Sequence, residues 1–169
     1  MFENLAVYPK IVVTGPQRSG TRIAAKMIAA DTGHEFVDEA SFHAYNVRRW
    51  REILQRDRIV VQSPHMLKDV VDDPPPGIFV VLMRRELAKI HESEQRIRWE
   101  QNFHGNTNEL RKFGCSEGEG DSAQIKYDYW QAHRKTVPFL ELQYESMRAH
   151  HLFISDNLRE DFGPLQTEL

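Results

Sequence analysis

Short runs of apolar residues alternate along the chain with longer segments of mixed polarity. Five of these runs are rich in β-branched or large apolar residues: 10–15, 35–38, 58–62, 78–83 and 138–143. Such runs predict strands, and continuously apolar runs are typical of strands that are covered on both faces. The pattern therefore predicts a buried sheet of about five strands.

The segments between these runs have the composition and the end signals of helices. Residues 21–31 are rich in alanine, isoleucine and methionine, and Gly33 follows them as a helix stop. Three further helices are predicted, over residues 42–57, 86–102 and 122–136. Because strands alternate with helices, we expect an α/β fold in which a parallel sheet lies between two helical layers, a three-layer sandwich.

Length and charge limit what kind of protein this is. The chain has 169 residues, 40% of them hydrophobic and 28% charged, and we read residues 1–169 as one domain with its own core. Residues 102–121 are rich in Gly, Asn, Ser and Glu and are expected to form a mobile loop. A net charge of −3 argues against a nucleic-acid binder and restricts any polyanion site to a local patch.

Cysteine content and hydropathy favour the cytoplasm. Cys115 is the single cysteine, so no disulfide can form within the chain. No apolar run is long enough to cross a bilayer, and residues 1–10 lack the features of a signal peptide. We therefore expect a cytoplasmic protein with no membrane partner. The sequence does not determine its oligomeric state.

The clearest chemistry lies in residues 15–22, Gly-Pro-Gln-Arg-Ser-Gly-Thr-Arg, which join the first predicted strand to the first predicted helix. Two glycines allow a tight turn close to a ligand, and the helix N-terminus offers free N–H groups to an anion. Arg18 and Arg22 add charge, and Ser19 and Thr21 add hydroxyl groups. These residues predict a phosphate-binding loop, and an ordinary strand–helix turn with surface arginines is the alternative.

This loop differs from the P-loop that binds Mg·ATP or Mg·GTP. That loop ends in Gly-Lys-Ser/Thr, whereas Gly20 is followed here by Thr21 and Arg22. Nucleotide hydrolases usually end a buried strand in a Mg²⁺-binding aspartate, but the third predicted strand ends in Gln62 and Ser63. We therefore expect a transferase without a metal site rather than a kinase or a hydrolase.

The loop resembles the 5′-phosphosulfate loop of the sulfotransferase family, notably its carbohydrate and tyrosylprotein members. These P-loop enzymes use 3′-phosphoadenosine 5′-phosphosulfate (PAPS) as donor. The resemblance implies that Arg18 and Thr21 hold the 5′-phosphate and the sulfonate. The implied donor-binding residues of the loop are Gln17, Arg18, Ser19, Gly20, Thr21 and Arg22.

Two further segments carry the resemblance. Family members have a strand that ends in arginine and a serine eight residues later, which both bind the 3′-phosphate; here Ser93 follows Arg85 by eight residues. Arg84 is the alternative arginine, and solvated helix-start residues are the alternative to a site. Residues 140–147 resemble a late strand and Tyr-Glu-Asp-Leu segment of the family, which supports the fold more than the site.

Sulfuryl transfer needs a base for the proton of the acceptor and cations for the developing negative charge. By the same resemblance, the base is a glutamate just after the second strand, which makes Glu39 the first candidate. The alternative is that Asp38 and Glu39 cap the helix that follows. His65, after the third predicted strand, is the competing base because histidine exchanges protons near neutral pH. Arg18 completes the predicted catalytic set.

The chain departs from the family pattern at several positions. Gln62 stands where members often carry a lysine that aids the leaving phosphate, and Arg22 replaces a second threonine. Either Arg22 or Lys68 supplies the missing charge, or activity is weakened or lost. The candidates for a further contact with the 3′-phosphate are Arg111, Lys112, Lys126 and Arg159, and those for an aromatic wall beside adenine are Tyr129 and Trp130.

Sulfuryl transfer from PAPS to a hydroxyl or amine is the leading hypothesis. The acceptor would be a small molecule, a glycan or a peptide, and neither nucleic acid nor metal is expected to take part. Two alternatives remain: a nucleoside or nucleotide kinase-like P-loop enzyme, and a non-catalytic nucleotide-binding protein of the same fold, which Gln62 favours.

Overall fold

A parallel five-stranded sheet forms the centre of the computed structural model, which describes residues 1–97, 110–115, 121–134 and 137–153. The strands are β1 (Lys10–Thr14), β2 (Glu35–Val37), β3 (Ile59–Gln62), β4 (Ile78–Arg84) and β5 (Phe139–Gln143). Their spatial order is β2-β3-β1-β4-β5, and every neighbouring pair is parallel. The five predicted strands and the parallel α/β class are confirmed.

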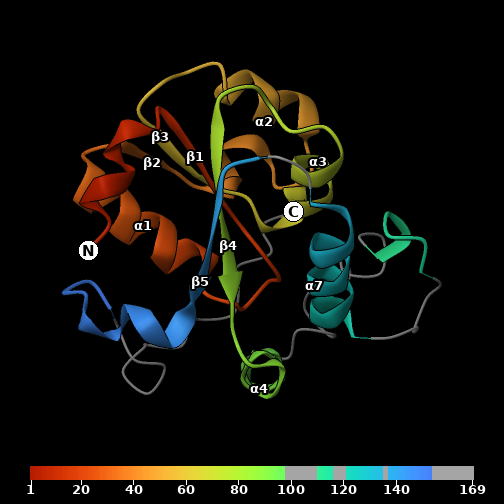
Figure 1. Cartoon of the computed structure of the whole chain (residues 1–169). Coiled ribbons are helices and arrows are strands. Elements are labelled where there is room, and N and C mark those ends of the chain that lie inside the picture. The colour runs from red at the N-terminus through yellow and green to blue at the C-terminus, as the bar shows by residue number, and fades with distance from the viewer. Residues whose placement is uncertain (98–109, 116–120, 135–136, 154–169) are drawn as a thin grey trace, which may run out of the picture.

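Helices cover both faces of this sheet (Figure 1). One face carries α1 (Thr21–Thr32) and the 3₁₀ helices η1 (Glu3–Val7) and η4 (Tyr144–Ala149). The opposite face carries α2 (Val47–Ile53), α3 (Leu67–Asp72) and α7 (Ser122–His133). Helix α4 (Leu87–Arg96) lies beyond the end of β4. The predicted three-layer sandwich is therefore confirmed.

The apolar strand sequences follow from this double cover. In β1, Ile11 and Val13 belong to the core beside α1, whereas Val12 belongs to the core on the opposite face; all three are fully buried. Side chains of a strand alternate between its two faces. Because helices cover both faces and exclude water, both sets of side chains are apolar, and the strand sequence is continuously hydrophobic.

The segment between β2 and β3 differs from the helix predicted over residues 42–57. It contains η2 (Glu39–Phe42), a turn, and only then α2. His43 and Ala44 interrupt the helix because their φ angles are 55° and 44°, in the left-handed region. Asn46 then caps α2, since its side chain accepts a hydrogen bond from the Arg49 N–H.

Two other predicted segments reach outside the described residues. Of the helix predicted over residues 86–102, the structure describes Leu87–Arg96. Most of the predicted loop 102–121 is likewise outside, although residues 110–115 form a helical turn in which Leu110 is buried. Among the described helices, none is long and apolar enough to cross a membrane.

The chain leads from β1 to strands on one side of it, and from β3 to strands on its other side. Strand β1 pairs with β3 on one side and with β4 on the other. Ligands of open parallel sheets bind beyond the carboxyl ends of strands at such a switch point. The loop after β1 and the residues that follow β3 and β4 therefore meet at one edge of the sheet.

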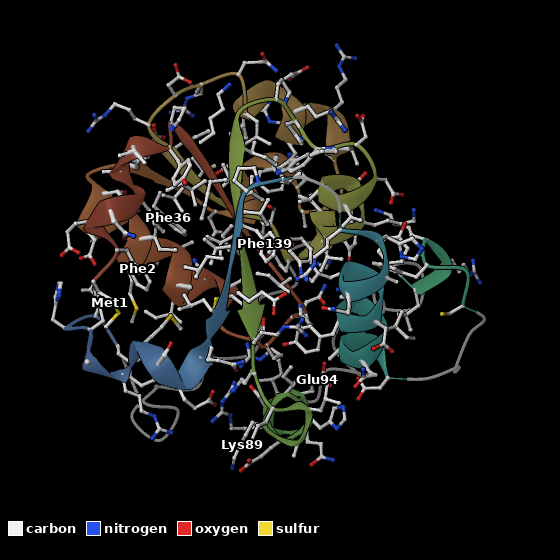
Figure 2. The ribbon with its side chains drawn as sticks, in the orientation of Figure 1. Met1, Phe2, Phe36, Lys89, Glu94 and Phe139 are labelled. Atoms are coloured by element: carbon white, nitrogen blue, oxygen red, sulfur yellow. The ribbon has the colours of Figure 1, made fainter. Side chains whose placement is uncertain are left out.

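Asp31 joins the N-terminal segment to the end of η4. Its carboxylate accepts a hydrogen bond from the Phe2 N–H (2.8 Å) and lies 3.1 Å from His150 Nε2. Phe2 is labelled beside Met1 in Figure 2, at the edge formed by these segments. Burial alone would raise the pKa of Asp31, but hydrogen bonds from Phe2, the N-terminal amine and His150 lower it to about 2.

We expect Asp31→Asn to lower the free energy of unfolding by about 1–2 kcal/mol at pH 7. The pKa of the folded carboxyl lies below the ordinary 3.8, so its contribution is fully present above about pH 4 and disappears as the pH falls towards 2. Urea unfolding of both proteins between pH 7 and pH 3 measures this. Asp57→Asn, at an exposed ion pair with Lys10, is the control and should change little. A difference that does not shrink at low pH would contradict the assignment.

Candidate functional site

The loop between β1 and α1 closes on itself through Ser19. The Ser19 N–H donates to the Pro16 carbonyl (3.2 Å), and the Ser19 hydroxyl donates to the same oxygen (2.6 Å). Arg18 has a φ angle of 65°, an uncommon conformation for a residue with a side chain. The fully buried Ser19 therefore holds the turn, and the turn fixes the direction of the Arg18 carbonyl.

Gly20 is the N-cap of α1 and packs directly against an aromatic ring. Its φ angle is 97°, and a Cβ atom at this position would lie 2.5 Å from Cδ2 of Tyr144. Tyr144 is buried and follows β5. The Arg85 guanidinium carbon lies 4.2 Å from the centre of the same ring. The Tyr144 ring thus connects the loop after β1 to the arginine after β4.

Arg85 and Ser93, which the family resemblance puts at one site, both contact Arg18. An Arg85 side-chain N–H donates to the Arg18 carbonyl (3.0 Å), and Arg18 Nε donates to the Ser93 hydroxyl (3.0 Å). Both residues are buried. Arg84, the alternative arginine, instead pairs with Glu141 (3.1 Å). Arg85 is therefore the arginine that lies beside the loop.

Tyr127 on α7 supports the backbone of Arg85. Its hydroxyl accepts a hydrogen bond from the Arg85 N–H (3.1 Å), while the Arg84 guanidinium lies 4.6 Å from the centre of its ring. Burial raises the pKa of Tyr127 to about 12, so the phenol stays protonated at neutral pH. The adjacent arginines thus face different surroundings because Tyr127 fixes the chain between them.

A cavity of about 1150 Å³ opens beside Arg85 and Ser93. Its basic lining residues are Arg85, Lys89, Arg96 and Arg148, and its acidic ones are Glu86, Glu92 and Glu145. Figure 2 labels Lys89 and Glu94 on α4 at this end of the molecule. Glu94 does not line the cavity, and its partial burial raises the pKa of its carboxyl. Arginines beside a helix N-terminus favour an anionic ligand, so the cavity and the loop form one candidate anion site.

Gln62 links the loop to the segment after β2. Its Nε2 donates to the Thr21 hydroxyl (3.3 Å), and its Oε1 accepts from the Glu39 N–H (3.3 Å). This glutamine occupies the position where the resembled family often has lysine. It brings no charge, but it fixes the distance between the anion loop and Glu39.

The two acidic residues after β2 have different surroundings. Asp38 caps η2 by accepting from the Ala40 N–H (3.0 Å), and its other oxygen pairs with Arg22 Nε (2.8 Å). The Glu39 carboxylate lies 3.6 Å from Nε2 of His65. The structure thus assigns the predicted capping role to Asp38 and brings the two candidate bases, Glu39 and His65, together.

Lys126 of α7 is a basic side chain that contacts the loop from outside it. Its ammonium group donates to Oε1 of Gln17, and its side chain is fully buried. Arg22 instead pairs with Asp38, and Lys68 pairs with Asp72. That Arg22 or Lys68 supplies charge to a bound donor stays a prediction.

The spacing of residues along α7 could have indicated from the sequence that Lys126 is buried. The buried residues of α7 are Ala123, Lys126, Tyr127 and Trp130. Their spacing follows the stripe i, i+3, i+4, i+7 of a packed helix face. A lysine on such a stripe is expected to have a specific polar partner, since burying its charge is otherwise unfavourable.

The two candidates for an aromatic wall beside adenine, Tyr129 and Trp130, lie away from the cavity. Trp130 lies in the core and donates its indole N–H to Glu141 (2.9 Å). Tyr129 packs against Phe113 and His133. Neither lines the cavity, whose aromatic residues are Tyr144 and Phe153. Of the remaining basic candidates, Lys112 lies 6.0 Å from the centre of the Tyr45 ring, and position 159 is outside the described residues.

Comparison with known proteins identifies the fold but not a family. No protein-family model and no curated protein matches the chain. Shikimate kinase from Acinetobacter baumannii, solved in complex with shikimate, is similar in structure, with a TM-score of 0.51 and 13% identity over 84% of this chain and 87% of that one. This likeness supports the predicted P-loop topology.

Two further solved structures are similar at lower TM-scores. The YorR protein from Bacillus subtilis, in complex with phosphorylated GDP, has a TM-score of 0.48 and 10% identity, and the match covers 79% of this chain and 85% of that one. A sugar kinase from Janibacter has a TM-score of 0.43 and 16% identity, with 80% and 84% covered. At these identities, the likeness is one of fold.

We expect Gly20→Ala to lower the free energy of unfolding by about 2–4 kcal/mol and to abolish anion binding by the loop, because the new methyl group meets the Tyr144 ring. Gly77→Ala is the matched control: its φ angle is 74°, but no heavy atom lies within 4 Å of the added carbon. It should cost about 1 kcal/mol and leave binding intact. Urea unfolding and phosphate titration measure both effects. Equal losses in the two variants would contradict a special contact at Gly20.

Proposed function

We propose that this chain is a P-loop transferase that moves a sulfuryl group from PAPS to a hydroxyl or amine. The observation that carries the proposal is the convergence of Arg85 and Ser93 on Arg18, through two hydrogen bonds of 3.0 Å. A donor with phosphate groups at both its 5′ and its 3′ positions needs cationic groups at two places. The loop supplies one of them, and the cavity beside it supplies the other.

The binding roles follow from this arrangement. The N–H groups at the start of α1 and the Arg18 side chain would hold the 5′-phosphosulfate. Arg85 and Ser93 would hold the 3′-phosphate, since both line the cavity. Gln17, Thr21 and the other loop residues would maintain the conformation of the loop. This conformation places positive charge where the leaving phosphate develops negative charge.

The reaction requires one proton transfer on the acceptor side. The bond between sulfur and the oxygen of the 5′-phosphate breaks, and a bond between sulfur and the acceptor oxygen or nitrogen forms. The acceptor proton would pass to the Glu39 carboxylate, whose main-chain N–H is held by Gln62. At the ends of β3 and β4 lie Gln62-Ser63 and Arg84-Arg85, and none of these four residues is a carboxylate that could bind Mg²⁺.

Phosphoryl transfer is the second candidate. The observation in its favour is the likeness in fold to shikimate kinase over 84% of this chain, and the three solved structures support this candidate better than they support sulfuryl transfer. Against it stand Thr21 in place of the P-loop lysine and Gln62 and Ser63 in place of a strand-end aspartate. A non-catalytic nucleotide-binding protein is the remaining alternative.

Calorimetry with 3′-phosphoadenosine 5′-phosphate and with ATP distinguishes the two reactions. We expect tight binding of the 3′-phosphorylated nucleotide without Mg²⁺ and weak binding of ATP. Arg85→Met should weaken the former about tenfold to hundredfold, because a charged hydrogen-bond donor is lost. Arg84→Met is the matched control and should retain the affinity. Preferential binding of Mg·ATP would overturn the proposal in favour of a kinase.

Turnover tests the proposed base. With radiolabelled PAPS and a panel of glycans, phenols and peptides, Glu39→Gln should reduce turnover about 10²-fold or more, with donor affinity unchanged. Glu35→Gln, at the start of β2 and paired with Arg56, is the control and should act like the natural chain. Full turnover by Glu39→Gln would remove Glu39 as the base. Tight donor binding without any turnover would favour the non-catalytic alternative.

A further inference from the structure

We propose that Lys126 is a positioning residue that, acting through Gln17, keeps the proton of His65 on Nε2, where it faces Glu39. This inference deepens the proposed function, since it separates the two candidate bases. It concerns the positions of protons in the chain itself. The tautomer of His65 can therefore be tested independently of the donor or acceptor that the site takes.

The first step is the orientation of the Gln17 amide. The Lys126 ammonium group is a hydrogen-bond donor and has no acceptor. Its partner in the Gln17 side chain is therefore the amide oxygen, Oε1. Both side chains are buried, so the contact is poorly screened by water and strongly disfavours the flipped amide, in which two donors would face each other.

The second step is the tautomer of His65. With Oε1 turned to Lys126, the Gln17 Nε2 faces Nδ1 of His65 at 2.8 Å. The amide nitrogen carries only donor hydrogens, so Nδ1 must accept. A neutral imidazole with an accepting Nδ1 carries its proton on Nε2.

The third step concerns Glu39. Nε2 of His65 lies 3.6 Å from a Glu39 carboxylate oxygen, and the Tyr45 ring lies 4.2 Å from the imidazole between ring centres. In this tautomer His65 turns an N–H group, not a lone pair, towards Glu39. It can thus orient the carboxylate but cannot take a proton at that nitrogen. Glu39 is left as the proton acceptor, and His65 positions it.

Lys126 lies 109 positions from Gln17 in the sequence, so this arrangement depends on the docking of α7. The helix packs on α3 and on the core beside it. A residue on one side of the loop thereby sets the proton position on its other side. The four side chains Lys126, Gln17, His65 and Glu39 form a single directed series of contacts.

The test is ¹⁵N NMR of the histidine rings in the ligand-free chain at pH 7.5. We expect the natural chain to hold His65 as the Nε2–H tautomer. In Gln17→Glu, which keeps the size of the side chain, the carboxylate would accept from both Lys126 and His65, so Nδ1 should become protonated and its shift should move to that of an N–H nitrogen. An unchanged tautomer in Gln17→Glu, or an Nδ1–H tautomer in the natural chain, would overturn the proposal.

Lys126→Met tests the origin of the effect. Without the ammonium group the Gln17 amide is free to turn, and His65 should show a mixture of the two tautomers. Lys68→Met, on α3 and paired with Asp72, is the matched control and should leave His65 unchanged. A pure Nε2–H tautomer in Lys126→Met would exclude Lys126 as the positioning residue. Because no ligand is added, this outcome is separate from any failure of the proposed sulfuryl transfer.

Discussion

The contact between the Tyr144 ring and the Gly20 backbone governs the shape of the site. The Tyr144 ring lies so close to the N-cap of α1 that it leaves no room for a side chain there, and the backbone of the loop after β1 packs directly against the ring. The same ring supports the Arg85 guanidinium. The end of the edge strand β5 therefore helps to set the relative positions of the anion loop and of the arginine after β4.

Around this contact, several separate elements reach the loop through polar side chains, and four of the described elements do so with a buried residue. These four are β3 through Gln62, the end of β4 through Arg85, α4 through Ser93 and α7 through Lys126. Each contact involves a buried group, where an unmet hydrogen bond is most unfavourable. The loop conformation is thus a property of the whole sheet edge rather than of its own eight residues.

The sequence predicts the parts of this fold that rest on local pattern. The strands are recognisable because helices cover both of their faces, whereas Arg85 and Ser93 stand out only through the resemblance to a family motif. The interruption of the helix after β2 and the partner of Lys126 cannot be recognised from the sequence. The left-handed angles at His43 and Ala44 and the docking of α7 depend on tertiary contacts that single-residue preferences do not contain.

Gln62 and Asp38 constrain the routes by which this loop could evolve or be redesigned. A conversion to the lysine-containing P-loop would replace Thr21 and Arg22, yet Thr21 accepts a hydrogen bond from Gln62 and Arg22 pairs with Asp38. Replacing the loop residues alone would remove these two contacts from Gln62 and Asp38. Substitutions in contact are not additive, so a change of donor at this site requires coordinated replacements on at least three elements of the sheet edge.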